Sequence, residues 1–226
     1  ARRGGRLGRL ADETRQRHGV ETLTVEADLA TAEAPGQILD FLTAHGRTVD
    51  VLINNAGFGL AANYGETRWE QQADFIQLMV TAPCELAHRV LPGMTHRGFG
   101  RIVNVASVAG LAPGAAGHTL YSASKAFMVR FSQSLHLEAE AHGVHVTALC
   151  PGFTYSEFHD VNGTRAVAAA TIPPWLWMGA EEVGAAGYDQ LVRSDMMATR
   201  TDGFALTGGL RSVLSGRVAY TVGLGG

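Results

Sequence analysis

Two side chains with complementary acid–base chemistry lie one helical turn apart in the stretch LYSASKAFMV, residues 120–129. Tyr121 and Lys125 are four positions apart, so in a helix they share one face. An unperturbed phenol has a pKa of about 10, and an ammonium held nearby favours the phenolate and lowers that pKa. The pair therefore predicts a general acid and base for proton exchange at neutral pH. An ordinary helix with an exposed lysine contains the same spacing.

The lysine is unusual in this chain, because it is the only lysine among 18 Lys and Arg residues. An ammonium is a compact charge on a flexible stem, and its three donors can bind a cofactor hydroxyl and still reach a phenol. The planar fork of arginine substitutes poorly for that role. The single exception to arginine usage therefore favours a chemical requirement for Lys125.

Further small and polar residues follow apolar runs, at points where strands are expected to end. Ser107 ends the run VNVAS, fourteen positions before Tyr121, where its hydroxyl can donate to the same substrate oxygen. The run VDVLIN continues into Asn-Ala-Gly at 55–57, and a CPG turn follows a later run. Small residues at the carboxyl end of a strand let a nucleotide approach the backbone closely.

Strand-length apolar runs alternate with helical patterns along the chain. The expected strands are 20–28, 49–57, 100–107 and 143–152, and the expected helices are roughly 6–18, 33–46, 67–93 and 119–142. Runs that are apolar throughout suit strands covered on both faces, as in parallel sheets. This order predicts an α/β layered fold in one domain.

The region after residue 152 differs in composition. Residues 153–180 mix small, aromatic and proline residues without a lasting period, and a helical pattern then resumes. An irregular apolar segment late in an α/β domain is typical of a lid or a wall of the ligand site. A plain packed loop is the alternative. Residues 203–209 are a candidate last strand.

Composition excludes several classes of protein. The net charge of −3 offers no basic field for nucleic acid. We find neither an apolar run of membrane-spanning length nor a signal peptide, so we expect a cytoplasmic protein. Cys84 and Cys150 are expected to be free and buried. The nine histidines show no metal-ligand spacing, so we expect no metal site.

Taken in order, the NNAG turn, Ser107, the Tyr121/Lys125 pair and the Pro151-Gly152 turn resemble the short-chain dehydrogenase/reductase superfamily. The resemblance extends from residue 1 to about 160 and more loosely to the end. It implies a Rossmann-type, doubly wound parallel sheet over residues 1–226, a nicotinamide cofactor and hydride transfer. Ser107 would polarise the substrate oxygen and Tyr121 would exchange its proton. Lys125 would hold the nicotinamide ribose and tune Tyr121.

The resemblance also implies a set of cofactor contacts. The residues are Arg2, Arg3, Asp28, Leu29, Asn55, Ala56, Gly57, Tyr121, Lys125, Pro151, Gly152 and Ser156. Asp28 would contact the adenine, and Ser156 stands where the family more often has threonine. Arg2 and Arg3 favour NADP, because a basic residue after the second strand can hold a 2′-phosphate. A solvated helix start is the competing interpretation of these two arginines.

Two departures from the family pattern are expected to matter. The sequence contains no Gly-x-x-x-Gly-x-Gly turn, and the glycines at 4–8 follow no strand. We therefore interpret the chain as lacking the family's first βαβ unit. We expect such a fragment to bind NADP poorly, to be unstable and to be inactive alone. Met79 stands where the family usually has an asparagine that helps to hold a water of the proton relay, and a thioether cannot replace an amide.

The resulting hypothesis is an NADPH-dependent oxidoreductase that reduces a ketone, possibly a 3-oxoacyl or other lipid-like carbonyl, to an alcohol. Residues 153–180 would then supply an apolar substrate wall. The alternative is an impaired or non-catalytic family member that binds nucleotide or a protein partner. The helices at 67–93 and 119–142 are expected to pair between subunits of a homodimer or homotetramer.

Overall fold

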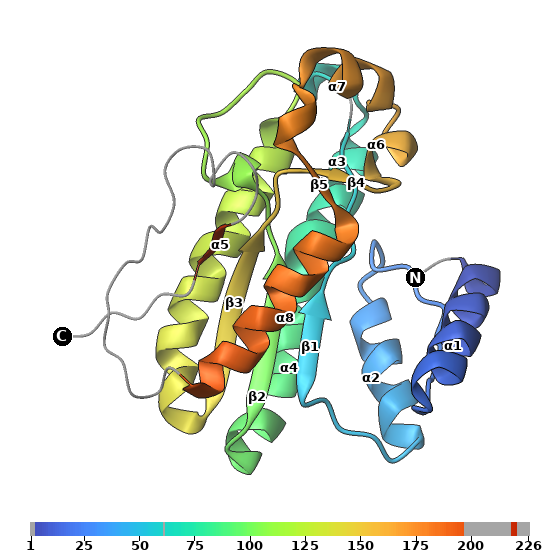
Figure 1. Ribbon diagram of the computed structural model, residues 1–226, viewed down its shortest axis with the longest axis vertical. Helices are drawn as coiled ribbons and strands as arrows, with labels where there is room; N and C mark the ends of the chain where they lie inside the picture. Colours follow the sequence, from blue (N-terminus) through green and yellow to red (C-terminus); the bar gives the residue numbers. More distant parts are fainter. Residues whose placement is uncertain (1–2, 61, 197–217, 221–226) are drawn as a thin grey trace.

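The computed structural model describes residues 3–60, 62–196 and 218–220, which form layers of helices around a sheet (Figure 1). The sheet has the order β1-β2-β3-β6. Its strands are β1 (Val51–Asn54), β2 (Gly100–Val105), β3 (Val144–Cys150) and β6 (Val218–Tyr220). The first three are parallel, and β6 pairs antiparallel with β3. The expected Rossmann-type α/β fold is therefore confirmed.

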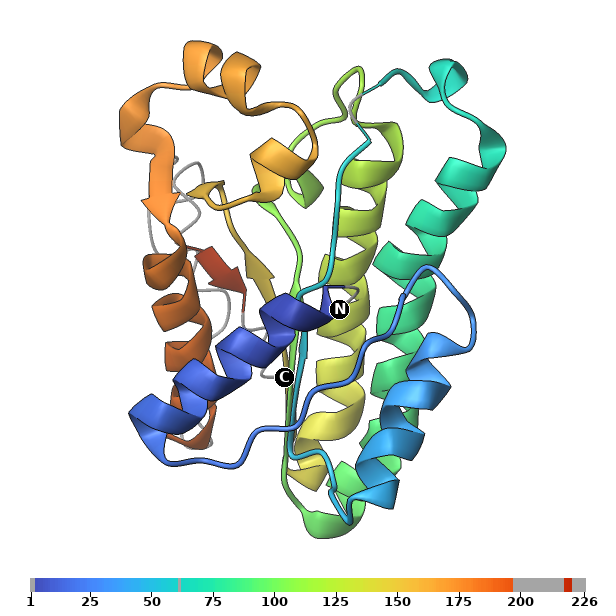
Figure 2. The same ribbon diagram turned by 90° about the vertical axis from the view of Figure 1, so that its right-hand side faces the viewer.

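Helices cover both faces of the sheet, as Figure 2 shows from the β1 edge. One face carries α4 (Ala82–Arg97) and α5 (Thr119–Ala139), and the other carries α8 (Ala180–Met196). The main core lies under α4 and α5. It contains Ala87, Val90, Met94, Ile102, Ala139, Val144 and Val146. Burial of these apolar side chains holds the carboxyl ends of the three parallel strands at the same end of the sheet.

The helices that precede α4 begin or end at residues suited to those positions. They are α1 (Gly4–His18), α2 (Ala34–Ala44), α3 (Trp69–Ile76) and the π turn Gln77–Thr81 that leads into α4. Pro35 lies in the first turn of α2, where an N–H has no helical partner. Gly19 and Gly98 end α1 and α4 in the left-handed conformation. The single helix expected over 67–93 is thus two helices joined by a π turn.

Residues 20–28 do not form the expected strand. A strand is stabilised by hydrogen bonds to a neighbouring strand, and within the described residues β1 pairs only with β2. Helix α1 lies across the β1 edge of the sheet, and the segment after it passes over this edge towards α2 (Figure 2). The β-branched composition of 20–28 is therefore not sufficient for a strand here.

Strand β1 is also less buried than its apolar sequence predicts. Val51 is 44% exposed and Ile53 is 55% exposed, while Leu52 and Asn54 are half-buried. By contrast, β2 and β3 are buried along nearly their whole length. Burial on both faces is therefore confirmed for the two inner strands and wrong for β1.

Residues 153–180 contain more regular structure than expected. The segment holds β4 (Phe153–Tyr155), α6 (Phe158–Val161), α7 (Arg165–Thr171) and β5 (Trp177–Gly179). Strands β4 and β5 pair in parallel as a separate small sheet. Short 3₁₀ turns occur at Tyr64–Glu66, Val108–Gly110, Glu140–His142 and Pro174–Leu176. The candidate strand at 203–209 lies outside the described residues.

A chain of buried hydrogen bonds ties β1, β2 and α5 together. Asn54 donates to the side-chain oxygen of Asn104 at 2.8 Å, and Asn104 donates to Ser132 Oγ at 2.9 Å. Ser132 in turn donates to the Met128 carbonyl at 2.7 Å. Asn104 and Ser132 are almost fully buried. Every member of the chain is paired, so this polar core fixes the position of α5 on the sheet.

We expect Ser132→Ala to lower the free energy of unfolding by about 1–3 kcal/mol, because it leaves the buried Asn104 amide without an acceptor. Ser134→Ala, at an exposed position on the same helix, is the matched control and should change stability by about 0.5 kcal/mol or less. Urea unfolding followed by circular dichroism measures both. Equal effects of the two substitutions would contradict the structural role of the buried chain.

Candidate active site

A serine and a tyrosine are joined beside the carboxyl end of β2. Ser107 lies two residues after β2, and Tyr121 lies in the first turn of α5. The Ser107 hydroxyl lies close enough to the Tyr121 phenol to favour its charged form. The Ser107 hydroxyl is also held by the Ala109 N–H at 3.2 Å and lies 3.5 Å from the Pro151 carbonyl. The structure therefore brings together the serine hydroxyl and the tyrosine phenol that the sequence predicted.

The predicted lysine lies one turn further along α5 and is buried. Lys125 is 7% exposed, and its Nζ donates to the Val105 carbonyl at 2.7 Å. The same Nζ lies 5.8 Å from the centre of the Tyr121 ring. Burial lowers the pKa of Lys125 to about 8, and the neighbouring Cys150 thiol acts in the opposite direction. The ammonium is thus poised to change its charge only slightly above neutral pH.

The pKa of Tyr121 differs from the sequence-based expectation. Burial raises the pKa of its phenol, and the nearby Ser107 hydroxyl acts in the opposite direction. The lowering by Lys125 that the spacing predicted is not found in this structure. The reason is geometric, because the lysine Nζ is directed to the Val105 carbonyl and not to the phenol oxygen. A buried, protonated phenol suits a proton donor better than a base.

A glycine allows α5 to approach the turn after β2. A Cβ on Gly110 would lie 2.5 Å from the Lys125 carbonyl carbon and 2.6 Å from the Ala126 nitrogen. These neighbours are backbone atoms of α5, which cannot move aside without moving the helix. Gly110 therefore sets the distance between the Ser107 turn and the helix that carries Tyr121 and Lys125.

The residues after β1 form an open shelf beside the lysine. Asn55, Ala56 and Gly57 are exposed and have no regular structure. A Cβ on Gly57 would lie 3.9 Å from Lys125 Nζ and 3.2 Å from Met79 Sδ. The glycine thus keeps space free next to a buried ammonium donor, and this arrangement fits the ribose hydroxyls of a dinucleotide.

Met79 occupies the other side of that shelf. It is buried with Phe75 and Leu78 and lies within the π turn Gln77–Thr81. Ala82 N–H donates across this turn to the Gln77 carbonyl. The sequence identified the thioether as a departure, but it gave no sign of the π turn, a feature that is frequent at functional sites.

Asp28 and Leu29, the predicted adenine contacts, lie in the turn that leads towards α2. Asp28 Oδ1 accepts from the Ala30 N–H at 3.1 Å, and Leu29 packs beside the cluster around Phe75. The carboxylate of Glu26 lies against Gly4 in the first turn of α1. The start of α1 and the predicted adenine contacts are therefore neighbours.

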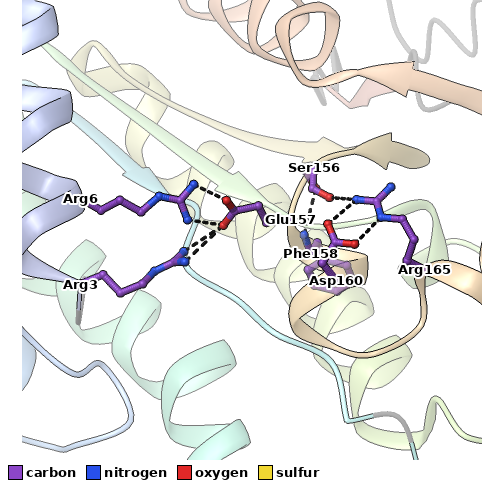
Figure 3. A network of polar contacts seen from close by, with 7 residues as sticks. All are labelled: Arg3, Arg6, Ser156, Glu157, Phe158, Asp160 and Arg165. Atoms are coloured by element: carbon purple, nitrogen blue, oxygen red, sulfur yellow. Dashed lines mark hydrogen bonds and ion pairs between the residues drawn. The ribbon is translucent and has the colours of Figure 1, made fainter.

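The arginines at the start of α1 are engaged by Glu157, an acidic residue that directly precedes α6 (Figure 3). Arg3 forms an ion pair with Glu157 at 3.2 Å, and Arg6 forms a second ion pair with the same carboxylate. These hydrogen bonds lower the pKa of Glu157. Arg2, the other predicted phosphate contact, lies outside the described residues.

Pro151, Gly152 and Ser156 follow the carboxyl end of β3. The Pro151 carbonyl accepts the Val108 N–H at 3.0 Å, so the CPG turn contacts the Ser107 turn directly. Ser156 Oγ accepts the Phe158 N–H at 3.3 Å, and the Ser156 carbonyl accepts from Arg165 (Figure 3). The structure thus places Pro151 beside the Ser107 turn, while Ser156 contacts the start of α6 and Arg165.

Residues 1–165 match the family model for short chain dehydrogenase. The chain belongs to this family. An uncharacterized oxidoreductase of Myxococcus xanthus is 38% identical over 161 residues, which cover 71% of this chain and 63% of that protein. A very-long-chain 3-oxoacyl-CoA reductase of Anas platyrhynchos is 33% identical over 165 residues, with coverage of 70% and 51%. The chain thus spans about half to two thirds of the length of these relatives.

Among solved structures, a short-chain dehydrogenase from Sphingobium yanoikuyae in complex with NADPH is similar, with a TM-score of 0.77 and 32% identity. The match covers 86% of this chain and 73% of that protein. Within the described part of this short-chain dehydrogenase, no helix is long and apolar enough to cross a membrane. The same residues contain no group of three potential metal ligands.

The structure adds residues that the sequence analysis did not identify. Phe158 packs against Tyr121 with ring centres 5.8 Å apart, and Asn162 Oδ1 accepts the Gly59 N–H at 3.0 Å. His118 lies beside Tyr121 on its other side, with ring centres 6.3 Å apart. These contacts join segments distant in sequence. Only the aromatic content of 153–180 gave a signal, and it did not single out Phe158.

We expect Gly110→Ala to displace α5 and to lower both thermal stability and the affinity for NADPH, because the new methyl group meets helix backbone. Gly114→Ala is the matched control, since nothing lies within 4 Å of a Cβ there. Melting temperature and titration of NADPH fluorescence check both variants. A Gly110→Ala variant as stable as Gly114→Ala would contradict the close approach.

A second prediction concerns the pH dependence of stability. The pKa of Lys125 falls from 10.5 to about 8 on folding, so between these values the unfolded chain binds a proton that the folded chain does not. The stability contribution of this group is therefore complete above pH 10.5 and is lost as the pH falls through 8. We expect Lys125→Met to raise the free energy of unfolding by about 1–3 kcal/mol near neutral pH, with a smaller gain at alkaline pH.

Urea unfolding of Lys125→Met and the wild type at about pH 7 and about pH 9.5 measures this difference in the free energy of unfolding, by linear extrapolation at each pH. Arg130→Met, at an exposed position on the same helix, is the control and should show no such pH dependence. A Lys125→Met variant that is less stable than the wild type by the same amount at both pH values would contradict this prediction.

Proposed function

We propose that this short-chain dehydrogenase is an NADPH-dependent reductase that converts a ketone to an alcohol. The observation that carries the proposal is that Ser107 and Tyr121 lie together after β2, with the buried Lys125 one turn away. These groups lie at the carboxyl end of parallel strands, where α/β sheets bind ligands. Membership of the family, and a solved relative in complex with NADPH, support the same activity.

In this mechanism the chain's own residues orient the carbonyl and supply a proton. NADPH, when bound, supplies the hydride. Ser107 donates a hydrogen bond to the carbonyl oxygen, and Tyr121 transfers its proton to that oxygen as negative charge develops there. The raised pKa of Tyr121 keeps the phenol protonated before the reaction. Lys125 faces the shelf at Gly57, from which its ammonium can bind the cofactor ribose and stabilise the phenolate that remains.

The cofactor preference in this proposal is for NADP(H). Arg3 and Arg6 present two guanidinium groups near the turn that holds Asp28, and guanidinium binds phosphate in a bidentate manner. Their present partner, Glu157, is about half exposed, so the ion pairs are weak and can be exchanged for a phosphate. Asp28 and Leu29 would contact the adenine, and Gly152 and Ser156 the nicotinamide.

For the substrate we propose a 3-oxoacyl or other lipid-like ketone. The segment 153–180 places Phe158 against Tyr121, and Phe153, Tyr155 and Trp177 form a further aromatic group. Such a wall suits an apolar chain attached to the carbonyl. The name of the relative from Anas platyrhynchos, a very-long-chain 3-oxoacyl-CoA reductase, supports this class.

A non-catalytic member that binds nucleotide or a protein partner is the second candidate function. The observation that favours it is Met79, which is buried beside the shelf and stands where the family usually has an asparagine. A thioether is a weak acceptor for a proton-relay water. We also expect a homodimer or homotetramer in the cytoplasm. Phe127, exposed on α5 and stacked on Phe131, supports pairing through that helix.

We expect Tyr121→Phe to lower kcat/KM for ketone reduction by about 100-fold or more, because it removes the proton donor and leaves the ring in place. The assay follows NADPH absorbance with a panel of 3-oxoacyl thioesters and simple ketones. It is run on the 226-residue chain and on any longer protein that the same gene encodes. Tyr155→Phe, which removes an exposed phenol in the aromatic group, is the control and should retain activity.

Two results would count against the reductase. Turnover that survives Tyr121→Phe would remove the proposed proton donor. Binding of NADPH without turnover of any ketone, in both wild type and variant, would favour the non-catalytic alternative.

A further inference from the structure

A recess lies beside Tyr121, on the side of α3. Its volume is about 10 Å³, and it lies between Leu60, Ala62 and Tyr64 on one side and α3 and the start of α5 on the other. Leu60, Phe75 and Leu120 give it apolar walls, and Tyr121 contributes to its lining. A volume of this size holds about one water molecule. A substrate whose carbonyl is bonded to Tyr121 can therefore place one group of the size of a hydroxyl in it.

One polar side chain in the lining of this recess is buried and incompletely paired. Gln72 is 4% exposed and lines the recess from α3. Among the described residues, its Oε1 is a buried side-chain oxygen without a hydrogen-bond partner. A buried carbonyl that lacks a donor forfeits the hydrogen bond that water would otherwise provide.

The neighbours of Gln72 fix which end of its amide is unpaired. The Thr67 hydroxyl donates its proton to the Tyr64 carbonyl at 3.1 Å. Thr67 Oγ1 can then only accept, and it accepts from Gln72 Nε2. A flipped amide would present two acceptors to each other. The carbonyl oxygen of Gln72 is therefore the free end, and a ligand that pairs with it must be a hydrogen-bond donor.

We propose that Gln72 is a specificity-determining residue, and that the substrate is a ketone with a hydroxyl group a few atoms from the carbonyl. The proposal rests on the ketone reductase function and names its substrate class more closely. The hydroxyl occupies the recess and donates to Gln72 Oε1 while the carbonyl binds Ser107 and Tyr121. A neutral acceptor in an apolar recess selects a hydroxyl over both a methyl group and a carboxylate.

Matched ketones test the proposal, because each pair exchanges only a hydroxyl for a methyl group. The pairs are hydroxyacetone with butanone, and 4-hydroxybutan-2-one with pentan-2-one. With NADPH we expect the wild type to favour one hydroxy ketone over its partner by about tenfold or more in kcat/KM. Gln72→Met keeps the length of the side chain and should bring that ratio to about one. If Gln72 had only a structural role, Gln72→Met would change kcat/KM equally for both ketones of a pair and leave their ratio unchanged.

A second measurement does not depend on turnover. The side-chain amide of Gln72 gives a pair of NMR signals, assigned by their loss in Gln72→Met. We expect hydroxyacetone or 4-hydroxybutan-2-one to shift these signals in the wild type, and butanone or pentan-2-one to leave them in place. The side-chain amide of exposed Gln71, assigned through Gln71→Met, is the control and should not respond.

The outcomes separate this inference from the proposed function. Ketone turnover that depends on Tyr121, with equal ratios in wild type and Gln72→Met and no shift of the Gln72 signals, would overturn the inference alone. A shift of these signals by a hydroxy ketone without any turnover would support the recess and contradict the reductase.

Discussion

The position of one buried ammonium is the constraint on which the site depends. Lys125 donates to the Val105 carbonyl at the end of β2, and this bond requires α5 to lie close against the turn that carries Ser107. Gly110 permits that approach, and the buried chain through Asn104 and Ser132 holds the helix in register with the sheet. Burying a charge costs stability. The fold therefore keeps Lys125 in place through its neighbours, not because the lysine itself stabilises the protein.

The fold could be predicted from the sequence wherever the decisive signal was local. Apolar runs with adjacent turns predicted β1, β2 and β3, and the main helices followed from the helical patterns between these runs. The prediction failed for 20–28, because strand formation depends on a neighbouring strand that composition does not reveal. It also failed at the π turn Gln77–Thr81, where the apolar pattern continues although the hydrogen bonding changes.

The same division applies to the candidate site. Ser107, Tyr121 and Lys125 could be identified because each lies at a fixed offset from a strand end or a helix start. Burial could not be deduced from that spacing, so the direction of the Tyr121 pKa was predicted wrongly. Contacts such as Phe158 with Tyr121 and Asn162 with Gly59 depend on how 153–180 folds back over the sheet, which no short motif encodes.

The exposed side chains of β1 have a consequence for the behaviour of the protein in solution. Among the described residues β1 is an outer strand, and Val51 and Ile53 remain accessible although α1 lies across this edge. Such a strand is a template for any extended peptide, including the same strand of another molecule. Self-association by this route would rise with concentration and would join molecules through backbone hydrogen bonds, in a geometry unlike packing between helices.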